Sequence, residues 1–182
     1  MKDRQPKHRQ AARERARLDR RTASRAGLPT ALIVCEGRCT EPYYLGGLLE
    51  HLGVNAANAH IQTGSYKTDA LSLVRDARAR FRSTPEYDHV FVVLDGDQAH
   101  LDEARREAGK GMAKAGGGRV TVELIVTSPC FEYWLLLHFE YTTRSLRSVE
   151  AVRALEAHLT DYEKGDREIF AKVSGGLAMA EA

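Results

Sequence analysis

Acidic residues follow two apolar, strand-like segments of this chain, and their position points to metal chemistry. The run TALIVC (30–35) stops at Glu36, and the run HVFVVLDGD (89–97) ends in Asp95 and Asp97. Carboxylates at close range repel one another, by roughly 4 kcal/mol for a pair about 4 Å apart at an effective dielectric constant near 20. A protein keeps such a cluster when a cation neutralises it, and Mg²⁺ prefers oxygen ligands of this kind.

The spacing of these acids fits a shared site. Asp95 and Asp97 are two residues apart, so an extended backbone points both side chains the same way. Gly96 between them lets the backbone or a substrate come close. Glu36 would serve as a metal ligand or a general base. We therefore predict that Glu36, Asp95 and Asp97 hold Mg²⁺ or Mn²⁺, the alternative being acidic surface turns, which are common.

Three further residues are candidates for the same catalytic site, each with a structural alternative. Glu41 heads a predicted helix, where a carboxylate also stabilises the helix dipole. His100 could bind phosphate or transfer a proton, or it could be a surface histidine. Glu132 lies in an otherwise apolar segment and needs a partner if it is buried, so a structural hydrogen bond is its alternative role. His138 is predicted to be a core histidine.

Strands and helices alternate along the chain. The pattern predicts strands at 30–35, 59–63, 89–97 and 119–128, and helices at 40–52, 68–82, 99–115, 129–140 and around 149–159. Such an order predicts a mostly parallel four-stranded sheet with helices on both faces, an α/β fold of the Rossmann-like kind. Functional groups in these sheets gather beyond the carboxyl ends of the strands. A strand order of 2-1-3-4 would bring Glu36 beside Asp95 and Asp97.

Composition and charge limit the class of protein. The 182 residues are 43% hydrophobic and 29% charged, as in an ordinary globular domain. No run of 18 apolar residues is present, so we expect no membrane span, and without a secretory signal we expect a cytoplasmic protein. Three cysteines fit a reducing compartment better than a disulfide framework. The final residues, 175–182, resemble the first turns of a helix that is cut short.

The first 26 residues form a basic arm. They hold ten Lys or Arg and three acids (10 − 3 = +7), which leaves 17 − 22 = −5 for the remainder. Arg-rich segments bind phosphate backbones by releasing counterions. We predict an arm over 1–28, disordered or helical on binding, ahead of a domain over 29–182, the alternative being a solvated tail. The predicted nucleic-acid contacts are Arg9, Arg13, Arg17, Arg20, Arg21 and, in a later loop, Lys67.

Three ordered motifs carry a resemblance to a known family. The segments IVCEGRCTEPYY, LDGDQAH and SPCFEYWLLLHFE, within about residues 31 to 141, are similar to those of RloB-like proteins, whose core resembles a Toprim domain. By that similarity Glu36 corresponds to the Toprim glutamate, and Asp95 and Asp97 to its Asp-x-Asp pair. Toprim domains occur in topoisomerases, primases and OLD-type nucleases, where these acids hold Mg²⁺ for phosphodiester chemistry.

The resemblance implies a Mg²⁺-dependent nuclease of a bacterial antiviral defence system, acting on RNA or DNA. RloB-like proteins resemble components of phage-defence and restriction-associated loci, often beside an AAA or ABC-type ATPase. The alternative is a non-catalytic Toprim-like module that binds nucleic acid or such an ATPase. A haloacid-dehalogenase-like phosphatase is disfavoured, because its Asp-x-Asp ends the first strand of the domain. The choice between RNA and DNA, the trigger and self-association stay open.

Overall fold

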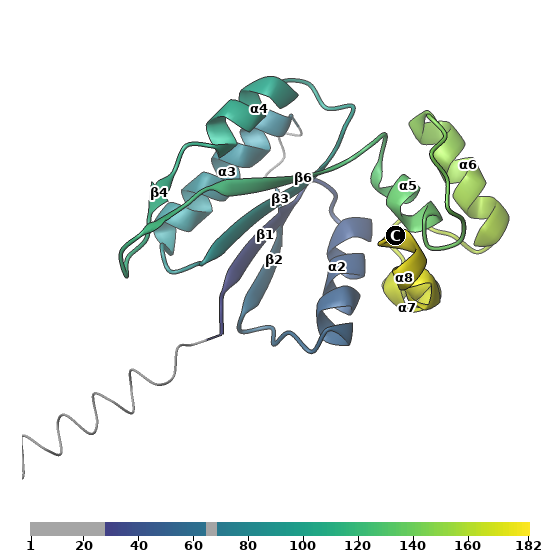
Figure 1. Ribbon diagram of the computed structural model, residues 1–182, viewed down its shortest axis with the longest axis horizontal. Helices are drawn as coiled ribbons and strands as arrows, with labels where there is room; N and C mark the ends of the chain where they lie inside the picture. Colours follow the sequence, from purple (N-terminus) through teal and green to yellow (C-terminus); the bar gives the residue numbers. More distant parts are fainter. Residues whose placement is uncertain (1–27, 65–68) are drawn as a thin grey trace, which may run out of the picture.

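The computed structural model describes residues 28–64 and 69–182 (Figure 1). The predicted basic arm therefore lies outside the described residues, apart from its last position. The same holds for all the predicted nucleic-acid contacts, which remain predictions: Arg9, Arg13, Arg17, Arg20, Arg21 and Lys67.

Strands and helices alternate along the described chain. The strands are β1 (Ala31–Cys35), β2 (Ala59–Thr63), β3 (His89–Asp95), β4 (Met112–Ala113), β5 (Arg119–Val120) and β6 (Val122–Thr127). The helices are α2 (Thr40–His51), α3 (Ala70–Ser83), α4 (Leu101–Ala108), α5 (Phe131–Leu136), α6 (Ser148–His158), α7 (Ile169–Val173) and α8 (Leu177–Ala180), with a 3₁₀ turn at Ser174–Gly176.

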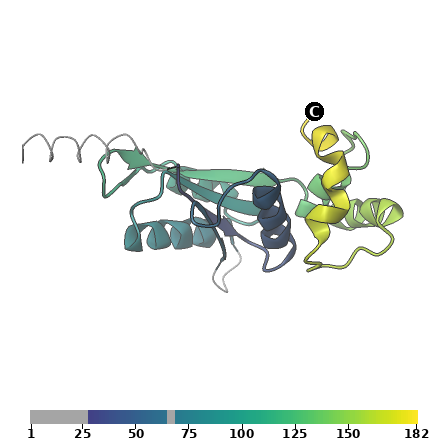
Figure 2. The same cartoon turned by 90° about the horizontal axis from the view of Figure 1, so that it is seen from below.

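Four of the strands form one parallel sheet in the order β2-β1-β3-β6. Because β6 is the fourth strand of the sheet along the chain, this is the predicted 2-1-3-4 order. The predicted α/β fold class is confirmed. Cys35, the last residue of β1, pairs with Thr63 on β2 and with Val93 on β3. Because the strands are parallel and in register, their carboxyl ends lie along one edge of the sheet. Helices α5 to α8 gather beyond that edge in both views (Figure 1, Figure 2).

The alternation of buried residues along the strands produces two cores. Side chains of successive strand residues point to opposite faces, so Leu32 and Val34 pack with α3 and α4, while Ile33 and Cys35 pack with α2 and the C-terminal helices. Each core is centred on fully buried apolar side chains, among them Val74, Phe81, Val92 and Leu94 on the first face and Tyr44, Leu135, Leu155 and Ile169 on the second. Helices therefore cover both faces of the sheet.

The predicted helix over 99–115 is wrong in its second half. Helix α4 ends at Ala108, and β4 and β5 then form an antiparallel hairpin. Its turn contains Gly117 and Gly118, both in the left-handed region at φ 90° and 83°, which favours glycine. The buried guanidinium of Arg78 on α3 donates hydrogen bonds to the backbone carbonyls of Glu107 and Lys110, and so satisfies carbonyl groups at the end of α4.

Other predicted boundaries also change. The strand over 119–128 divides at Thr121, because β5 pairs with β4 whereas β6 pairs with β3. The helix over 129–140 is regular only within α5. Leu52 and Val149, at the ends of two predicted helices, are 61% and 62% exposed. The C-terminal segment packs against the turn that follows α5, since a Cβ at Gly176 would lie 1.7 Å from the carbonyl oxygen of His138.

The two adjacent glycines of α2 have different surroundings, and this gives a first prediction. A Cβ at Gly47 would lie 2.5 Å from Cβ of Phe170 on α7, whereas a Cβ at Gly46 would meet nothing within 4 Å. We expect Gly47→Ala to lower the free energy of unfolding by roughly 1–3 kcal/mol through overpacking. Gly46→Ala should raise it by about 0.5–1 kcal/mol through helix propensity. Denaturant titration of both variants measures these values, and shifts of the same sign would contradict this account.

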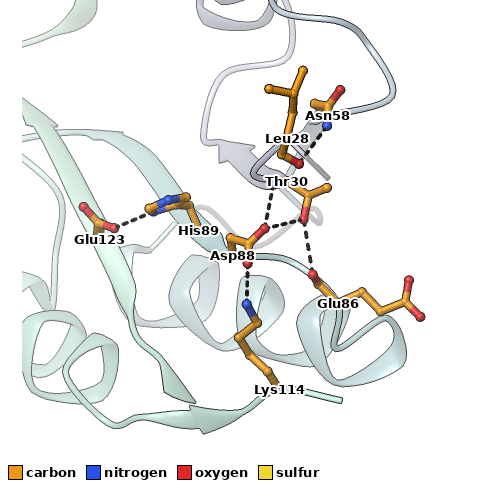
Figure 3. A network of polar contacts seen from close by, with 8 residues as sticks. All are labelled: Leu28, Thr30, Asn58, Glu86, Asp88, His89, Lys114 and Glu123. Atoms are coloured by element: carbon orange, nitrogen blue, oxygen red, sulfur yellow. Dashed lines mark hydrogen bonds and ion pairs between the residues drawn. The ribbon is translucent and has the colours of Figure 1, made fainter. Parts of the chain in front are cut away.

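A polar network fixes the amino end of the sheet (Figure 3). The carboxylate of Asp88, just before β3, accepts hydrogen bonds from the backbone N–H (2.9 Å) and hydroxyl (3.3 Å) of Thr30, just before β1, and pairs with Lys114 after β4. These partners lower the pKa of Asp88 to about 2, the Lys114 hydrogen bond contributing most. The network joins the start of β1 to the start of β3, which supports the alignment of their opposite, carboxyl ends.

Within residues 28–64 and 69–182, no helix combines the length and the apolar character needed to cross a membrane.

Candidate functional site

Glu36 lies immediately after β1 and reaches toward the end of β3. Its backbone N–H donates to the carbonyl of Val93 at 2.9 Å, which continues the β1–β3 pairing by one residue. Its side-chain Oε2 accepts a hydrogen bond from the backbone N–H of Asp95 at 3.0 Å, and Oε1 accepts one from Nε2 of Gln98 at 2.6 Å. The first-strand acid is thus held in contact with the third-strand motif.

Asp95 is fixed by contacts with β6. Its Oδ1 accepts a hydrogen bond from the hydroxyl of Thr127 at 2.9 Å. The next residue, Gly96, donates its N–H to the carbonyl of Thr127 at 2.7 Å, and a Cβ at this glycine would lie only 3.2 Å from that oxygen. Glycine at position 96 permits the close approach of the β6 backbone, as predicted; the other predicted possibility was the close approach of a substrate.

A cavity of about 450 Å³ lies at the carboxyl ends of β1 and β3, against the starts of α2 and α5. It is lined by four carboxylates from three parts of the chain, together with two basic side chains and four other residues. The acids are Glu36, Glu41, Asp95 and Glu132, and the bases are Arg38 and Lys164. Four of the six predicted catalytic residues therefore lie around one cavity, with a formal lining charge of 2 − 4 = −2.

Glu41 has both a site position and a structural role. Its side chain is buried and its Oε1 accepts a hydrogen bond from the backbone N–H of Gly37 at 3.2 Å. A Cβ at Gly37 would lie 1.9 Å from Oε2 of the same carboxylate. The glycine after Glu36 therefore makes room for the second acid, which stands in the first turn of α2.

Glu132 is 4% exposed and has the partners that burial requires. Its Oε1 accepts a hydrogen bond from the hydroxyl of Tyr162 at 3.1 Å and lies 3.0 Å from Nζ of Lys164. The expectation that a buried Glu132 is partnered is confirmed. Glu132 also lines the cavity, so it has the structural hydrogen bond and also lies in the candidate site.

Burial and mutual repulsion shift the pKa values of three acids upward. Burial is the largest cause for Glu36, whose pKa rises from 4.5 to about 7, and the charges of Asp95, Glu41 and Asp97 raise it further. The pKa of Asp95 is raised by burial and by the charges of Glu132 and Asp97, against the hydrogen bond from Thr127. The pKa of Glu41 is likewise raised, mainly by burial. Such shifts are typical of an acidic site without enough compensating positive charge.

Glu132 shows the opposite shift. Burial alone would raise its pKa, but hydrogen bonds from Lys164, from its own backbone and from Cys130 together lower it. The pKa of Lys164 is raised, chiefly by the hydrogen bond to Glu132. Both partners of this pair are therefore charged at neutral pH.

Asp97 and His100 are not among the residues that line the cavity. Asp97 is exposed, yet it stands near enough for its charge to raise the pKa values of Glu36 and Asp95. His100 occupies the N-cap position of α4 at φ 62° without a side-chain capping hydrogen bond, and its Nδ1 lies 3.9 Å from Oε2 of Glu103. The metal role of Asp97 and the catalytic role of His100 remain predictions.

The donor set suits a hard divalent cation. Mg²⁺ and similar ions bind carboxylate oxygens, usually through one or two protein carboxylates, and keep several waters. Glu36 and Asp95 supply two such groups at one strand edge, with Asp97 nearby. In the part of the chain that the structure describes, however, no three His, Cys, Asp or Glu side chains are grouped so that they could hold one ion. We conclude that the residues fit such an ion chemically, with waters or substrate completing its coordination.

His138 is a core residue, as predicted. It is 3% exposed, and its Nδ1 lies 3.0 Å from the carbonyl oxygen of Trp134, which requires the proton on Nδ1. The other ring nitrogen can then accept the hydrogen bond from the hydroxyl of Tyr44 at 3.0 Å. Tyr44 is 1% exposed and packs edge-on against Phe131 and Phe170, so this tyrosine is also structural.

Sequence reasoning missed several residues of the site. Gln98 and Thr127 hold Glu36 and Asp95, while Tyr162 and Lys164 hold Glu132. Gln98 lies within the Asp-x-Asp motif region and could have been noticed there. Lys164 had only a weak signal, a glycine at the next position that indicates a turn.

Comparison with known proteins identifies the family. No curated protein and no solved structure gives a significant match to the chain. A family model described as RloB-like protein matches residues 31–182, well beyond the three motifs, and the chain therefore belongs to the RloB-like protein family.

Proposed function

We propose that this chain is a Mg²⁺- or Mn²⁺-dependent nuclease that cleaves phosphodiester bonds of RNA or DNA. The observation that carries the proposal is the convergence of Glu36, Glu41, Asp95 and Glu132 on one cavity at the carboxyl edge of a parallel sheet. A lining with a formal charge of −2 repels a phosphate group, so a phosphodiester substrate requires added positive charge there. A divalent cation supplies it, and Toprim-like proteins hold one with acids in corresponding motifs.

Glu36 and Asp95 would hold the cation, with Asp97 as the third predicted ligand. A bound ion of this kind polarises a phosphate group and lowers the pKa of a bound water. The chain contributes orientation: Thr127 fixes the carboxylate of Asp95, and Gln98 with the backbone of Asp95 fixes that of Glu36. Glu41, whose pKa is raised by burial and by neighbouring acids, is placed to accept or return a proton.

The proposed biological setting rests on the family resemblance. RloB-like proteins resemble components of bacterial antiviral defence and restriction-associated loci, and we extend that role to this chain. An ATPase partner and capture of nucleic acid by the basic arm belong to the same proposal. The arm, 1–28, carries an excess of positive charge. That charge would attract the phosphate backbone and so offset the acidic lining of the cavity during substrate binding.

A non-catalytic binding module is the second candidate. The observation that favours it is the absence, within the described residues, of three side chains already grouped around one ion position. In addition, both oxygens of Glu36 already accept hydrogen bonds. A module of this kind would bind nucleic acid or an ATPase without cutting, and its affinity would not depend on divalent ions.

A cleavage assay with metal removal separates the two candidates. The purified chain is incubated with labelled tRNA, single-stranded DNA and duplex DNA, in Mg²⁺, in Mn²⁺ or in excess chelator. We expect cleavage of at least one substrate with metal and none with chelator, with activity restored by adding metal back. Binding without cleavage in every metal condition would support the binding module, and cleavage that persists in chelator would overturn the metal mechanism.

A further inference from the structure

Residues 162–165, between α6 and α7, border the acidic cavity through Lys164 and are anchored at both ends. At one end the hydroxyl of Tyr162 donates to Oε1 of Glu132 at 3.1 Å. At the other, the N–H of Gly165 donates to Oγ1 of Thr40 at 3.4 Å. Gly165 has φ 92°, and a Cβ there would lie 3.2 Å from Cβ of Cys39. This segment, which we call the 162–165 clamp, therefore joins the starts of α2 and α5.

Lys164 lies between the two anchors and neutralises one wall of the cavity. Its Nζ is 3.0 Å from Oε1 of Glu132, and the two side chains are 73% and 6% exposed, respectively. The carboxylate is thus part of the wall, whereas the ammonium group approaches it from the solvent side. Of the four acids that line the cavity, Glu132 is the one whose pKa is lowered, since Glu36, Glu41 and Asp95 all shift upward.

The ammonium group can be exchanged when another cation takes its place. Its own side chain is 73% exposed and is readily solvated, whereas the carboxylate of Glu132 is 6% exposed and would otherwise be left as an uncompensated charge. Lysine is a point charge on a flexible four-carbon stem, so its ammonium can reach a second acceptor without moving the backbone. A phosphate oxygen that enters the cavity offers such an acceptor, because Lys164 is one of the lining residues.

We propose that Lys164 is an exchangeable counterion, which neutralises Glu132 before ligands bind and transfers to a phosphate oxygen of the substrate when nucleic acid enters. Glu132 then loses its ammonium partner, keeps the hydrogen bond from Tyr162, and becomes available to the divalent cation. This inference rests on the proposed nuclease function and adds a substrate-contacting residue to it. It also implies reciprocity, because a phosphate that strengthens cation binding must itself be bound more strongly in the presence of the cation.

The test uses Mn²⁺ and a nucleoside monophosphate as probes, so that no cleavage is needed. Mn²⁺ affinity of the full chain is measured from the electron paramagnetic resonance signal of the free ion, with protein-free titrations to correct for Mn²⁺ bound by the nucleotide. We expect Lys164→Met to bind Mn²⁺ alone about fivefold more tightly, because one competing charge is removed. The same variant should bind the nucleoside monophosphate at least about threefold more weakly in saturating Mn²⁺.

Opposite shifts of the two affinities distinguish exchange from a purely structural role, which would weaken both. Lys164→Arg should stay close to wild type, and so should Lys110→Met, which removes an exposed lysine whose Nζ is 2.6 Å from Glu107 on α4. The thermal midpoint of each variant checks that it is folded. Unchanged or weaker Mn²⁺ binding by Lys164→Met overturns the counterion role and leaves the nuclease proposal standing. Failure of the wild-type chain to bind Mn²⁺ overturns the nuclease proposal itself.

Discussion

Replacing Asp95 by Asn will abolish metal-dependent cleavage, with a fall in rate of roughly 100-fold or more. A catalytic cation contributes several kcal/mol to the transition state, and each 1.36 kcal/mol or so corresponds to a factor of ten. Asn keeps the shape of the side chain and an oxygen that can accept the hydrogen bond from Thr127. Because the pKa of Asp95 is raised by burial and by neighbouring acids, loss of its charge should leave the fold intact or slightly more stable.

A matched control separates loss of chemistry from loss of structure. Asp102 stands in the first turn of α4, and its side chain is 80% exposed. Asp102→Asn makes the same chemical change away from the cavity and should retain full activity. Initial rates of both variants are measured on the best substrate in Mg²⁺, alongside the thermal midpoint. Undiminished cleavage by Asp95→Asn would remove Asp95 from the mechanism and point to a contaminating nuclease.

The fold could be predicted where local pattern and tertiary packing agree. β1 and β3 are short apolar runs with buried faces on both sides, and such runs are typical of central parallel strands. The β4–β5 hairpin was missed because its strands are only two residues long, too short for an alternating pattern, and the Ala and Lys residues around them favour a helix. A carbonyl at the end of α4 accepts a hydrogen bond from Arg78, a buried residue on another helix that looks like an ordinary surface arginine in the sequence.

Some residues of the candidate site could likewise be predicted from the sequence, and others could not. Glu36 and Asp95 were accessible to prediction, because each lies at the carboxyl end of an identifiable strand and strand order then makes them neighbours. Lys164 was not, since it is 128 positions beyond Glu36 and is exposed, with no periodic pattern around it (164 − 36 = 128). Its contact with Glu132 depends on how α6 and α7 pack, which no local signal encodes.

Replacing Glu36 by Gln will stabilise the protein at pH 8 in the absence of metal and leave its stability at pH 5 almost unchanged. The folded-state pKa of Glu36 is about 7, against an ordinary value of 4.5, chiefly because of burial. The native state therefore binds more protons than the unfolded state between these values, so stability falls as pH rises through this window and stays reduced above it. For a half-buried group we expect a gain on the order of 2 kcal/mol for Glu36→Gln at pH 8.

The reason for expecting so large an effect is that the amide removes a charge without removing hydrogen bonds. The Gln oxygen can still accept from the N–H of Asp95, and Gln98 can turn its own oxygen toward the new NH₂ group. Denaturant titrations in chelator at pH 5 and pH 8 measure the change, with the exposed Glu156→Gln on α6 as a control expected to show none. Saturating Mg²⁺ should stabilise wild type and not the variant, so the advantage of Glu36→Gln shrinks or reverses. A variant that is equally destabilised at both pH values would mean that Glu36 is a structural hydrogen-bonding residue whose charge does not matter.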